Sequence, residues 1–215
     1  MRDETITWTL YSYDELSDTA KDHALERLWD INVDYNWYES ITDDIGAFGD
    51  ASWLGCRWGK EFNLDKGRYC NIDNIGCTFS EIYRQWEPAR EQFPDVAEAV
   101  LDPFFKEFTA REIRQLLQLE RSGLLGQLSG ETSTSRRSAR TDVDINDYPP
   151  ESQRHKRICA LLTQLESAWG DLVNNLEYYY VNLLQKEYDY QTDRAQIEES
   201  IRANEYEFYE NGNLA

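Results

Sequence analysis

The stretch ESQRHKRICALLTQLESAWGDLVNNLEYYYVNLLQKEYDY, from Glu151 to Tyr190, decides the fold. It contains no proline and a single glycine, Gly170. Its apolar residues recur at steps of three and four, which predicts one face of an α-helix. They are Ile158, Leu161, Leu165, Ala168, Leu172, Leu176, Tyr179 and Leu183. About 39 residues at 1.5 Å each would make a rod of roughly 60 Å, long enough to cover a whole sheet.

Five segments outside this helix have the composition or the alternation of β-strands. They are residues 5–13, 52–64, 68–79, 139–146 and 205–210. The turn sequence LDKG between the second and third segments predicts that these two form a hairpin. The first strand and the long helix carry the strongest apolar faces, so we expect them to pack together. The residues expected to be buried against one another are Trp8, Leu10, Leu161, Leu165, Leu172 and Leu176.

Shorter helices are predicted between the strands. Ser17 should cap the first, because a serine oxygen can accept a hydrogen bond from the free N–H groups of the first turn. Its apolar face would consist of Ala20, Ala24, Leu25, Leu28 and Trp29. Ser80 should cap a helix that Pro88 interrupts, and Thr192 should cap a last short helix.

Segregated strands and helices, with at least one hairpin, favour the α+β class. We therefore expect a single α+β domain over residues 1–215. A sheet of about five strands, antiparallel or mixed, would pack on helices dominated by the long one near the C-terminus. Residues 122–138 hold several glycines and a run of serine and threonine, which predicts a flexible loop. Proteases should cut it first at Arg136 or Arg137.

The charge of the chain is its most unusual property. The 215 residues include 41 Asp and Glu against 22 Lys and Arg, a net charge of −19. Such a surface repels nucleic acid and anionic membranes and attracts basic surfaces, including the DNA-binding grooves of other proteins. The alternative is that the acidity serves solubility alone.

The N-terminus, MRDETITWTLYSYDEL, lacks the apolar segment of a signal peptide, so we expect a cytoplasmic protein. No apolar run reaches the length of about 18 residues that spans a membrane. The cysteines Cys56, Cys70, Cys77 and Cys159 lack C-x-x-C spacing and are expected to be reduced thiols. A zinc site built from the first three and a histidine is the alternative, and otherwise no cofactor is expected.

Sequence motifs of common enzyme classes do not occur in the chain. It has no phosphate-binding glycine loop, no nucleophile elbow and no H-E-x-x-H. His23 and His155 lie beside charged residues in predicted helices, and we interpret them as surface residues rather than general bases.

A partial match to a calcium loop occurs near the fourth strand. Asp142, Asp144 and Asn146 fit the first ligand positions of an EF-hand. However, Asp147 and Gln153 stand where that loop needs glycine and glutamate. The solvent face of a strand explains the two aspartates better.

The C-terminal segment is acidic and rich in tyrosine. Its carboxylates are Glu187, Asp189, Asp193, Glu198, Glu199, Glu205, Glu207 and Glu210, and its interleaved tyrosines are Tyr188, Tyr190, Tyr206 and Tyr209. Tyrosine beside carboxylate can imitate base and phosphate or fill the hot spots of a basic partner. We therefore predict that this segment binds a partner protein. A solvated helix face and a charge-protected edge strand are the alternative.

A basic island lies within the acidic chain. It consists of Arg136, Arg137, Arg140, Arg154, His155, Lys156 and Arg157. These residues could bind a phosphate or an acidic partner. Pairing with the carboxylates of the same chain is the favoured interpretation.

Three stretches together resemble a known family. They are WTLYSYDELSDTAKDHA from Trp8 to Ala24, LDKGRYC from Leu64 to Cys70, and LQKEYDYQTDRAQIEESIRANEYEFYENG from Leu184 to Gly212. The family comprises acidic proteins of tailed phages and prophages, some labelled "antitoxin of a toxin–antitoxin stability system". The resemblance covers about a quarter of the chain. It implies a phage setting in a bacterial host cell and gives no catalytic residues to transfer.

These observations lead to three functional hypotheses. The first is a non-enzymatic inhibitor of a host defence protein, of the restriction or CRISPR type, that acts through a DNA-mimic-like acidic surface. The second is an antitoxin-like neutraliser of a basic toxin protein. The third is a metal-dependent enzyme whose carboxylates are dispersed in the sequence. In the first two the partner is a protein with a basic surface, and direct binding to nucleic acid or membrane is not expected.

Overall fold

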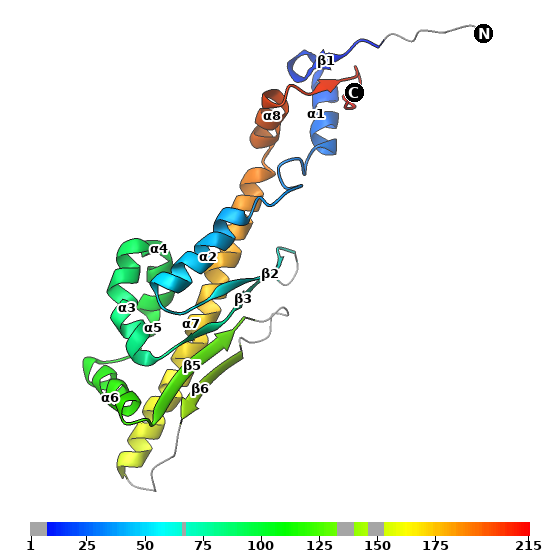
Figure 1. The fold of residues 1–215 in the computed structure, drawn as a ribbon. Coiled ribbons are helices and arrows are strands. Elements are labelled where there is room, and N and C mark those ends of the chain that lie inside the picture. The colour runs from blue at the N-terminus through cyan, green and yellow to red at the C-terminus, as the bar shows by residue number, and fades with distance from the viewer. Residues whose placement is uncertain (1–7, 66–67, 133–139, 146–152) are drawn as a thin grey trace, which may run out of the picture. The chain divides into compact units, whose positions relative to one another are not determined.

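The computed structural model describes residues 8–65, 68–132, 140–145 and 153–215. The chain divides into two compact units (Figure 1). The terminal unit consists of Met1–Glu39 and Gln185–Ala215, and the middle unit consists of Ser40–Leu184. Both units mix helices with short strands, which confirms the α+β class. The expectation of one domain over the whole chain stays a prediction.

The long helix α7 covers Gln153–Gln191, 39 residues, as its apolar period predicts. Most of it belongs to the middle unit, where Leu161, Leu165, Leu172 and Leu176 are buried. That part of the prediction is confirmed.

The strands of the middle unit form two small sheets rather than one large one. In the first, β2 (Arg57–Asn63) pairs antiparallel with β3 (Tyr69–Asp73), which confirms the predicted hairpin. In the second, β4 (Ile75–Cys77), β5 (Leu125–Glu131) and β6 (Arg140–Ile145) pair in the order β4-β5-β6, all antiparallel. The expected five-stranded sheet is therefore wrong.

Strand β5 lies within the segment for which a flexible loop was predicted. Helix α6 (Ala110–Arg121) ends just before Gly123, whose φ of 74° is readily adopted by glycine. The chain then enters β5, whose pairing is irregular between Leu125 and Leu128. The predicted loop is corrected for this part, and residues 133–139, including Arg136 and Arg137, lie outside the described residues.

Thr132 links the two sheets at the end of β5. The Ile72 amide donates a hydrogen bond to Thr132 Oγ1 at 2.6 Å, and the Thr132 amide donates to the Ile72 carbonyl at 3.1 Å. Thr132 Oγ1 donates in turn to the Cys70 carbonyl at 2.7 Å. One buried threonine therefore satisfies three backbone groups of β3.

Capping boxes set the beginnings of two helices of the middle unit. Thr78, rather than the expected Ser80, caps α3 (Phe79–Gln92). The Thr78 amide in turn donates a hydrogen bond to the Glu81 carboxylate. Pro88 lies inside α3 and does not interrupt it. Thr109 and Glu112 form the same device at α6. The remaining helices of the unit are α2 (Glu39–Ala51), α4 (Pro94–Val96), the π-helical η2 (Ala97–Leu101) and α5 (Asp102–Lys106).

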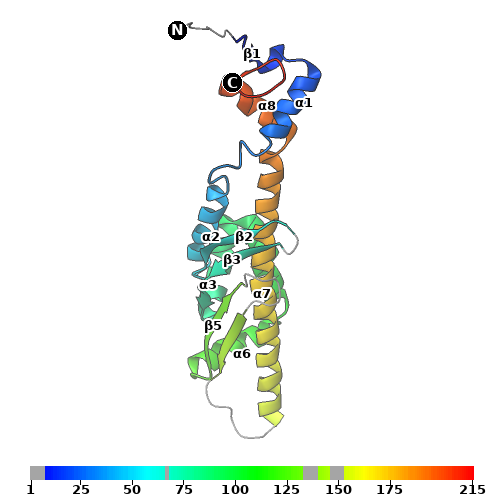
Figure 2. The ribbon, with the colours of Figure 1, turned by 90° about the vertical axis from the view of Figure 1, so that its right-hand side faces the viewer.

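Trp169 on α7 joins the strands to the helices in the core of the middle unit. Its indole Nε1 donates to the Ser129 carbonyl of β5 at 2.8 Å, and its ring centroid lies 6.2 Å from that of Phe104. Figures 1 and 2 show β5 running beside α7. The buried Phe79 ring contacts Phe104 and Phe105, so an aromatic cluster fills the space on the helical side.

The terminal unit is built from both ends of the chain. Strand β1 (Tyr11–Ser12) pairs antiparallel with β7 (Glu207–Phe208). The unit also holds the 3₁₀ turn η1 (Tyr13–Glu15), α1 (Asp18–Arg27), the end of α7 and α8 (Arg194–Ala203). Ser17 caps α1, as predicted. The buried core consists of Tyr13, Leu16, Ala20, Ala24, Leu25, Ile197, Ile201 and Phe208.

Three expectations for the terminal unit need correction. The strand predicted for residues 5–13 is only Tyr11–Ser12 within the described residues, because the Ser12–Glu15 capping box turns the chain into η1. Trp8 and Leu10 are 66% and 39% exposed rather than buried. Asp193, not Thr192, caps α8.

Candidate functional site

Most of the net negative charge belongs to the terminal unit. Its 70 residues hold 18 Asp and Glu against 6 Lys and Arg, a net charge of −12. The 145 residues of the middle unit hold 23 against 16, a net charge of −7. The smaller unit therefore carries the larger share of the net −19, and its field is the strongest attraction for a basic partner.

All the residues predicted to bind a partner fall within this unit. The end of α7 holds Glu187, Tyr188, Asp189 and Tyr190, the helix α8 with its cap holds Asp193, Glu198 and Glu199, and the last turn and strand hold Glu205, Tyr206, Glu207, Tyr209 and Glu210. Some of them make hydrogen bonds or ion pairs within the unit, and the others face solvent.

Three of these carboxylates have local structural roles. Glu187 accepts a hydrogen bond from Gln191 Nε2 at 2.7 Å, and Asp189 accepts one from Gln185 Nε2 at 2.6 Å. Asp193 accepts a hydrogen bond from an amide of the first turn of α8 and caps that helix. These contacts support the solvated-helix interpretation for this part of the segment.

Glu198 lies at the centre of an ionic cluster. Its carboxylate accepts hydrogen bonds from Arg194 Nε at 3.0 Å and Arg202 at 3.2 Å, and its side chain is only 23% exposed. Each arginine also reaches the N-terminal segment, Arg194 to Asp22 at 2.9 Å and Arg202 to Asp14 at 3.0 Å. Glu198 therefore stabilises the unit from within and is not a free binding residue.

The pKa values of this cluster follow from its contacts. Burial alone would raise the pKa of Glu198, but the hydrogen bonds from the arginines outweigh it and hold the pKa below its ordinary value. Burial, followed by the Glu198 charge, raises the pKa of Tyr13 to about 12. The contacts of the cluster therefore favour the charged form of Glu198 and the neutral form of Tyr13.

Four carboxylates of the C-terminal segment remain directed to solvent. Glu199, Glu205, Glu207 and Glu210 are exposed, and their carboxylates make no hydrogen bond or ion pair within the described residues. A partner can reach these charges without breaking an internal contact.

The tyrosines of the segment also differ in their surroundings. Tyr206 packs against the core of the unit, and the Tyr188 ring lies 5.6 Å from that of Trp37. Tyr209 lies 5.4 Å from Trp8 in an edge-on arrangement. Tyr190 is 54% exposed. Tyr190, and Trp8 beside Tyr209, therefore expose large aromatic surfaces to a partner.

Exposed aromatic and large apolar side chains gather in the same unit. Six of the nine such residues in the described chain belong to it: Trp8, Leu10, Trp29, Tyr35, Tyr190 and Leu214. Sequence reasoning missed Trp29, which it assigned to the apolar face of the first helix. Helix α1 ends at Arg27, so Trp29 lies beyond that face and is half exposed.

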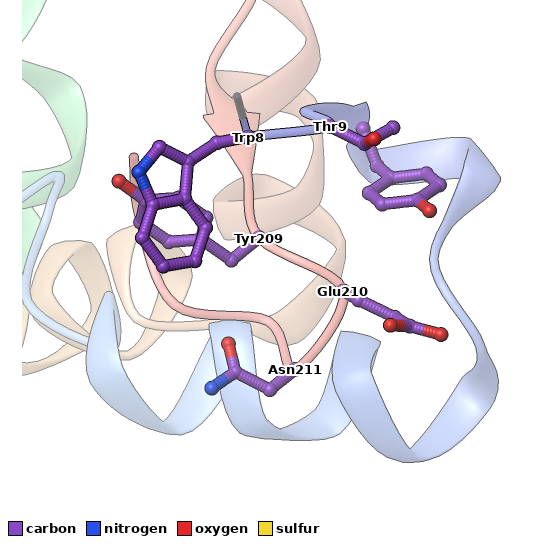
Figure 3. A pocket seen from close by; sticks show the side chains of 6 residues that line it. Trp8, Thr9, Tyr209, Glu210 and Asn211 are labelled. Carbon is purple, nitrogen blue, oxygen red and sulfur yellow. The ribbon is translucent and has the colours of Figure 1, made fainter. Parts of the chain in front are cut away.

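A hollow of about 770 Å³ opens beside the Trp8–Tyr209 pair. Its lining consists of Trp8, Thr9, Tyr11, Tyr209, Glu210 and Asn211. Figure 3 shows the Trp8 indole next to the Tyr209 ring, with Glu210 and Asn211 on the turn that follows. The hollow combines aromatic rings with a carboxylate, although Trp8 was expected in the core.

The other chemical features of the chain lie elsewhere. Within the described residues, no three His, Cys, Asp or Glu side chains are grouped so as to hold a metal ion, and no helix has the length and apolar character needed to cross a membrane. His23 is partly exposed and its Nδ1 lies 3.0 Å from the Asn211 carbonyl oxygen. Of the basic island, Lys156 and Arg157 are exposed on α7, and Arg136 and Arg137 lie outside the described residues.

No family model, curated protein or solved structure matches the chain. The resemblance to acidic phage proteins therefore stays a prediction that rests on the three sequence stretches that carry it.

Proposed function

We propose that the chain is a phage-encoded, non-enzymatic binding protein that inhibits a host antiviral defence protein. In this proposal the terminal unit occupies the basic surface with which a restriction or CRISPR nuclease binds DNA. The observation that carries it is the coincidence, in one unit, of a net charge of −12 and six of the nine exposed large apolar or aromatic side chains found among the described residues.

The combination is more specific than acidity alone. A protein that is acidic only for solubility needs charge, but it gains nothing from exposing tryptophan and tyrosine beside that charge. Partner-binding surfaces use aromatic side chains as anchors, and complementary charge accelerates the encounter. The carboxylates of Glu199, Glu205 and Glu207 are available for that electrostatic role, because they are exposed and make no hydrogen bond or ion pair with the part of the chain that the structure describes.

An antitoxin-like role is the second candidate, favoured by the label of the family that the sequence resembles. It would use the same surface against a basic toxin, so the two candidates differ only in the partner. A pull-down from host lysate with the full chain as bait supplies that partner for quantitative measurement. Saturable binding of Mg²⁺, Mn²⁺ or Zn²⁺ in calorimetry, together with turnover of a substrate, would replace both candidates by the enzyme hypothesis.

Two triple variants with the same charge change test the role of the surface. The first, Glu199→Lys with Glu205→Lys and Glu207→Lys, reverses exposed charges of the terminal unit. The control, Glu87→Lys with Glu91→Lys and Glu98→Lys, reverses exposed charges of the middle unit. Each variant changes the net charge from −19 to −13, so a difference between them reports position and not total charge.

Association rates with the purified partner, measured over a range of salt concentrations, give the result. The terminal-unit variant should associate roughly tenfold or more slowly at low salt and show a flatter salt dependence than the control. DNA should compete with the wild-type protein if the partner is a nuclease. Equal rates for the two variants at both low and high salt would exclude the proposed surface, and the acidity would then be a solubility feature.

A further inference from the structure

We infer that the hollow beside Trp8 and Tyr209 receives an arginine side chain of the partner protein. This inference rests on the proposed function and identifies the anchor within the acidic surface. The hollow is distinct from the exposed carboxylates Glu199, Glu205 and Glu207, none of which lines it.

The shape of the hollow suits a flat, extended group. Trp8 and Tyr209 meet edge to face, with ring centroids 5.4 Å apart and planes at 70°, so their rings form two walls at an angle. The Trp8 residue is 66% exposed despite this contact. Tyr11 contributes a third ring to the lining. An aromatic surface that stays this open in the folded unit is available to a ligand.

The chemistry of the lining selects a cation. Aromatic faces attract cations, and the Glu210 carboxylate, which also lines the hollow, can accept charge-assisted hydrogen bonds. Thr9 and Asn211 add polar side chains at the edge of the hollow. The net charge of −12 of the unit opposes an anionic ligand such as a nucleotide, although bases also stack on aromatic rings.

Arginine fits this lining better than lysine. Its guanidinium is planar, weakly hydrated and able to stack on a ring while its N–H groups reach a carboxylate. The terminal unit already contains this arrangement internally, because the Arg202 guanidinium lies 5.2 Å from the Tyr13 ring centroid and pairs with Asp14. Nucleic-acid-binding surfaces are rich in arginine, which agrees with the class of partner proposed above.

Nuclear magnetic resonance on the full chain tests the inference with a defined probe. The probe is the capped peptide acetyl-Gly-Arg-Gly-amide, and its control contains citrulline, which keeps the shape of arginine but carries no charge. The indole N–H signal of Trp8 is assigned with Trp8→Phe. The arginine peptide should shift this signal saturably, and the citrulline peptide should not shift it. The same peptide with lysine in place of arginine should shift it more weakly.

Glu210→Gln tests the contribution of the carboxylate while it keeps the shape of the side chain. It should weaken binding of the arginine peptide at least severalfold, whereas Glu87→Gln, at an exposed position of the middle unit, should leave it unchanged. Equal shifts by the arginine and citrulline peptides would overturn the inference. A shift of the Trp8 signal by adenosine monophosphate, without one by the arginine peptide, would overturn it in favour of a base-binding site.

Partner binding separates a failure of this inference from a failure of the proposed function. Trp8→Ala removes an exposed ring, so it should leave the fold intact and increase the dissociation rate of the partner at least severalfold. If Trp8→Ala and Glu210→Gln bind as the wild type while the terminal charge-reversal variant associates slowly, the arginine site is wrong and the proposed function stands. If all three bind as the wild type, both proposals are wrong.

Discussion

The Arg202 guanidinium donates a hydrogen bond from Nε to the Asp14 carboxylate at 3.0 Å, although the two residues are 188 positions apart. The same bridging between chain ends recurs where Arg27 donates to Asn213 and where β1 pairs with β7. The terminal unit therefore depends on both ends of the chain at once. Bringing the two ends together closes a long loop, and these contacts must offset the entropy which that closure costs.

The first prediction separates two neighbouring glutamates of α8. Glu198→Lys should lower the free energy of unfolding by about 1–3 kcal/mol, because it places a third cation between Arg194 and Arg202. Glu199→Lys, which makes the same charge change at an exposed position, should change it by about 0.5 kcal/mol or less. Denaturant titrations of both variants give the comparison.

Equal stability of the two variants would contradict the cluster described here. Both glutamates belong to the segment predicted to bind a partner, and the ion pairs of Glu198 with Arg194 and Arg202 correct that prediction for Glu198. A signal for this cluster does exist in the sequence. Arg194, Glu198 and Arg202 are spaced by four residues, the separation at which opposite charges meet on a helix.

Local sequence patterns predicted much of the secondary structure. The bounds predicted for the long helix, residues 151–190, differ by only one or two residues from those of α7. A sustained apolar period without proline leaves few alternatives to a long helix. The hairpin of β2 and β3 and the strand β6 also followed from alternation and turn residues. These elements depend on near neighbours in the chain, which a sequence displays directly.

Strand β5 was missed because its pattern is not a regular alternation. The buried Leu125 and Leu128 are three residues apart, and the pairing with β6 shifts its register between them. A bulge of this kind changes which side chains face inward and hides the period of two. Together with Gly126 and Gly130, this spacing resembles a loop.

The candidate site could be predicted in its composition but not in its detail. The acidic, tyrosine-rich segment is visible in the sequence, and all of it belongs to the terminal unit. The ionic cluster around Glu198 was not predicted in full, because Arg194 and Arg202 also pair with Asp22 and Asp14, which are remote in sequence. The exposure of Trp8 depends on the turn at Ser12–Glu15, which ends the apolar alternation early.

The second prediction concerns the core of the middle unit. Leu165→Ala should lower the free energy of unfolding by about 2–5 kcal/mol, because Leu165 is fully buried on α7 and its loss leaves a cavity. Tyr178→Ala on the same helix is the control, since Tyr178 is 69% exposed and should cost about 0.5 kcal/mol or less. A cost for Leu165→Ala as small as that of the control would mean that the buried face of α7 is assigned wrongly.

The third prediction concerns the four cysteines, all of which are reduced thiols. Cys56, Cys70 and Cys77 are buried, and burial raises the pKa of the Cys56 thiol to about 12 and those of Cys70 and Cys77 above their ordinary range. Cys159, which is partly exposed, should therefore be alkylated first by iodoacetamide.

Peptide mass spectrometry over a time course measures this order. Cys159→Ser should remove the fast phase and leave the slow reaction of the other three, which should become fast only in denaturant. Alkylation of Cys70 or Cys77 in the native protein at the rate of Cys159 would contradict their burial.

The fourth prediction concerns alkaline pH. Burial, and then the nearby Glu198 carboxylate, raises the pKa of Tyr13 from its ordinary value of 10.0 to about 12. The unfolded chain therefore loses this proton at a lower pH than the folded chain, and stability from the neutral hydroxyl is lost as the pH rises from 10 to 12. Tyr13→Phe has no such proton, so its stability relative to the wild type should increase over that range. Denaturant titrations of both proteins from about pH 9 to about pH 11.5 measure the difference.

In a Glu198→Gln background the increase in the relative stability of Tyr13→Phe should be smaller, because the Glu198 charge is one cause of the pKa shift of Tyr13. A difference that stays constant across the range would contradict the burial of the Tyr13 hydroxyl beside Glu198.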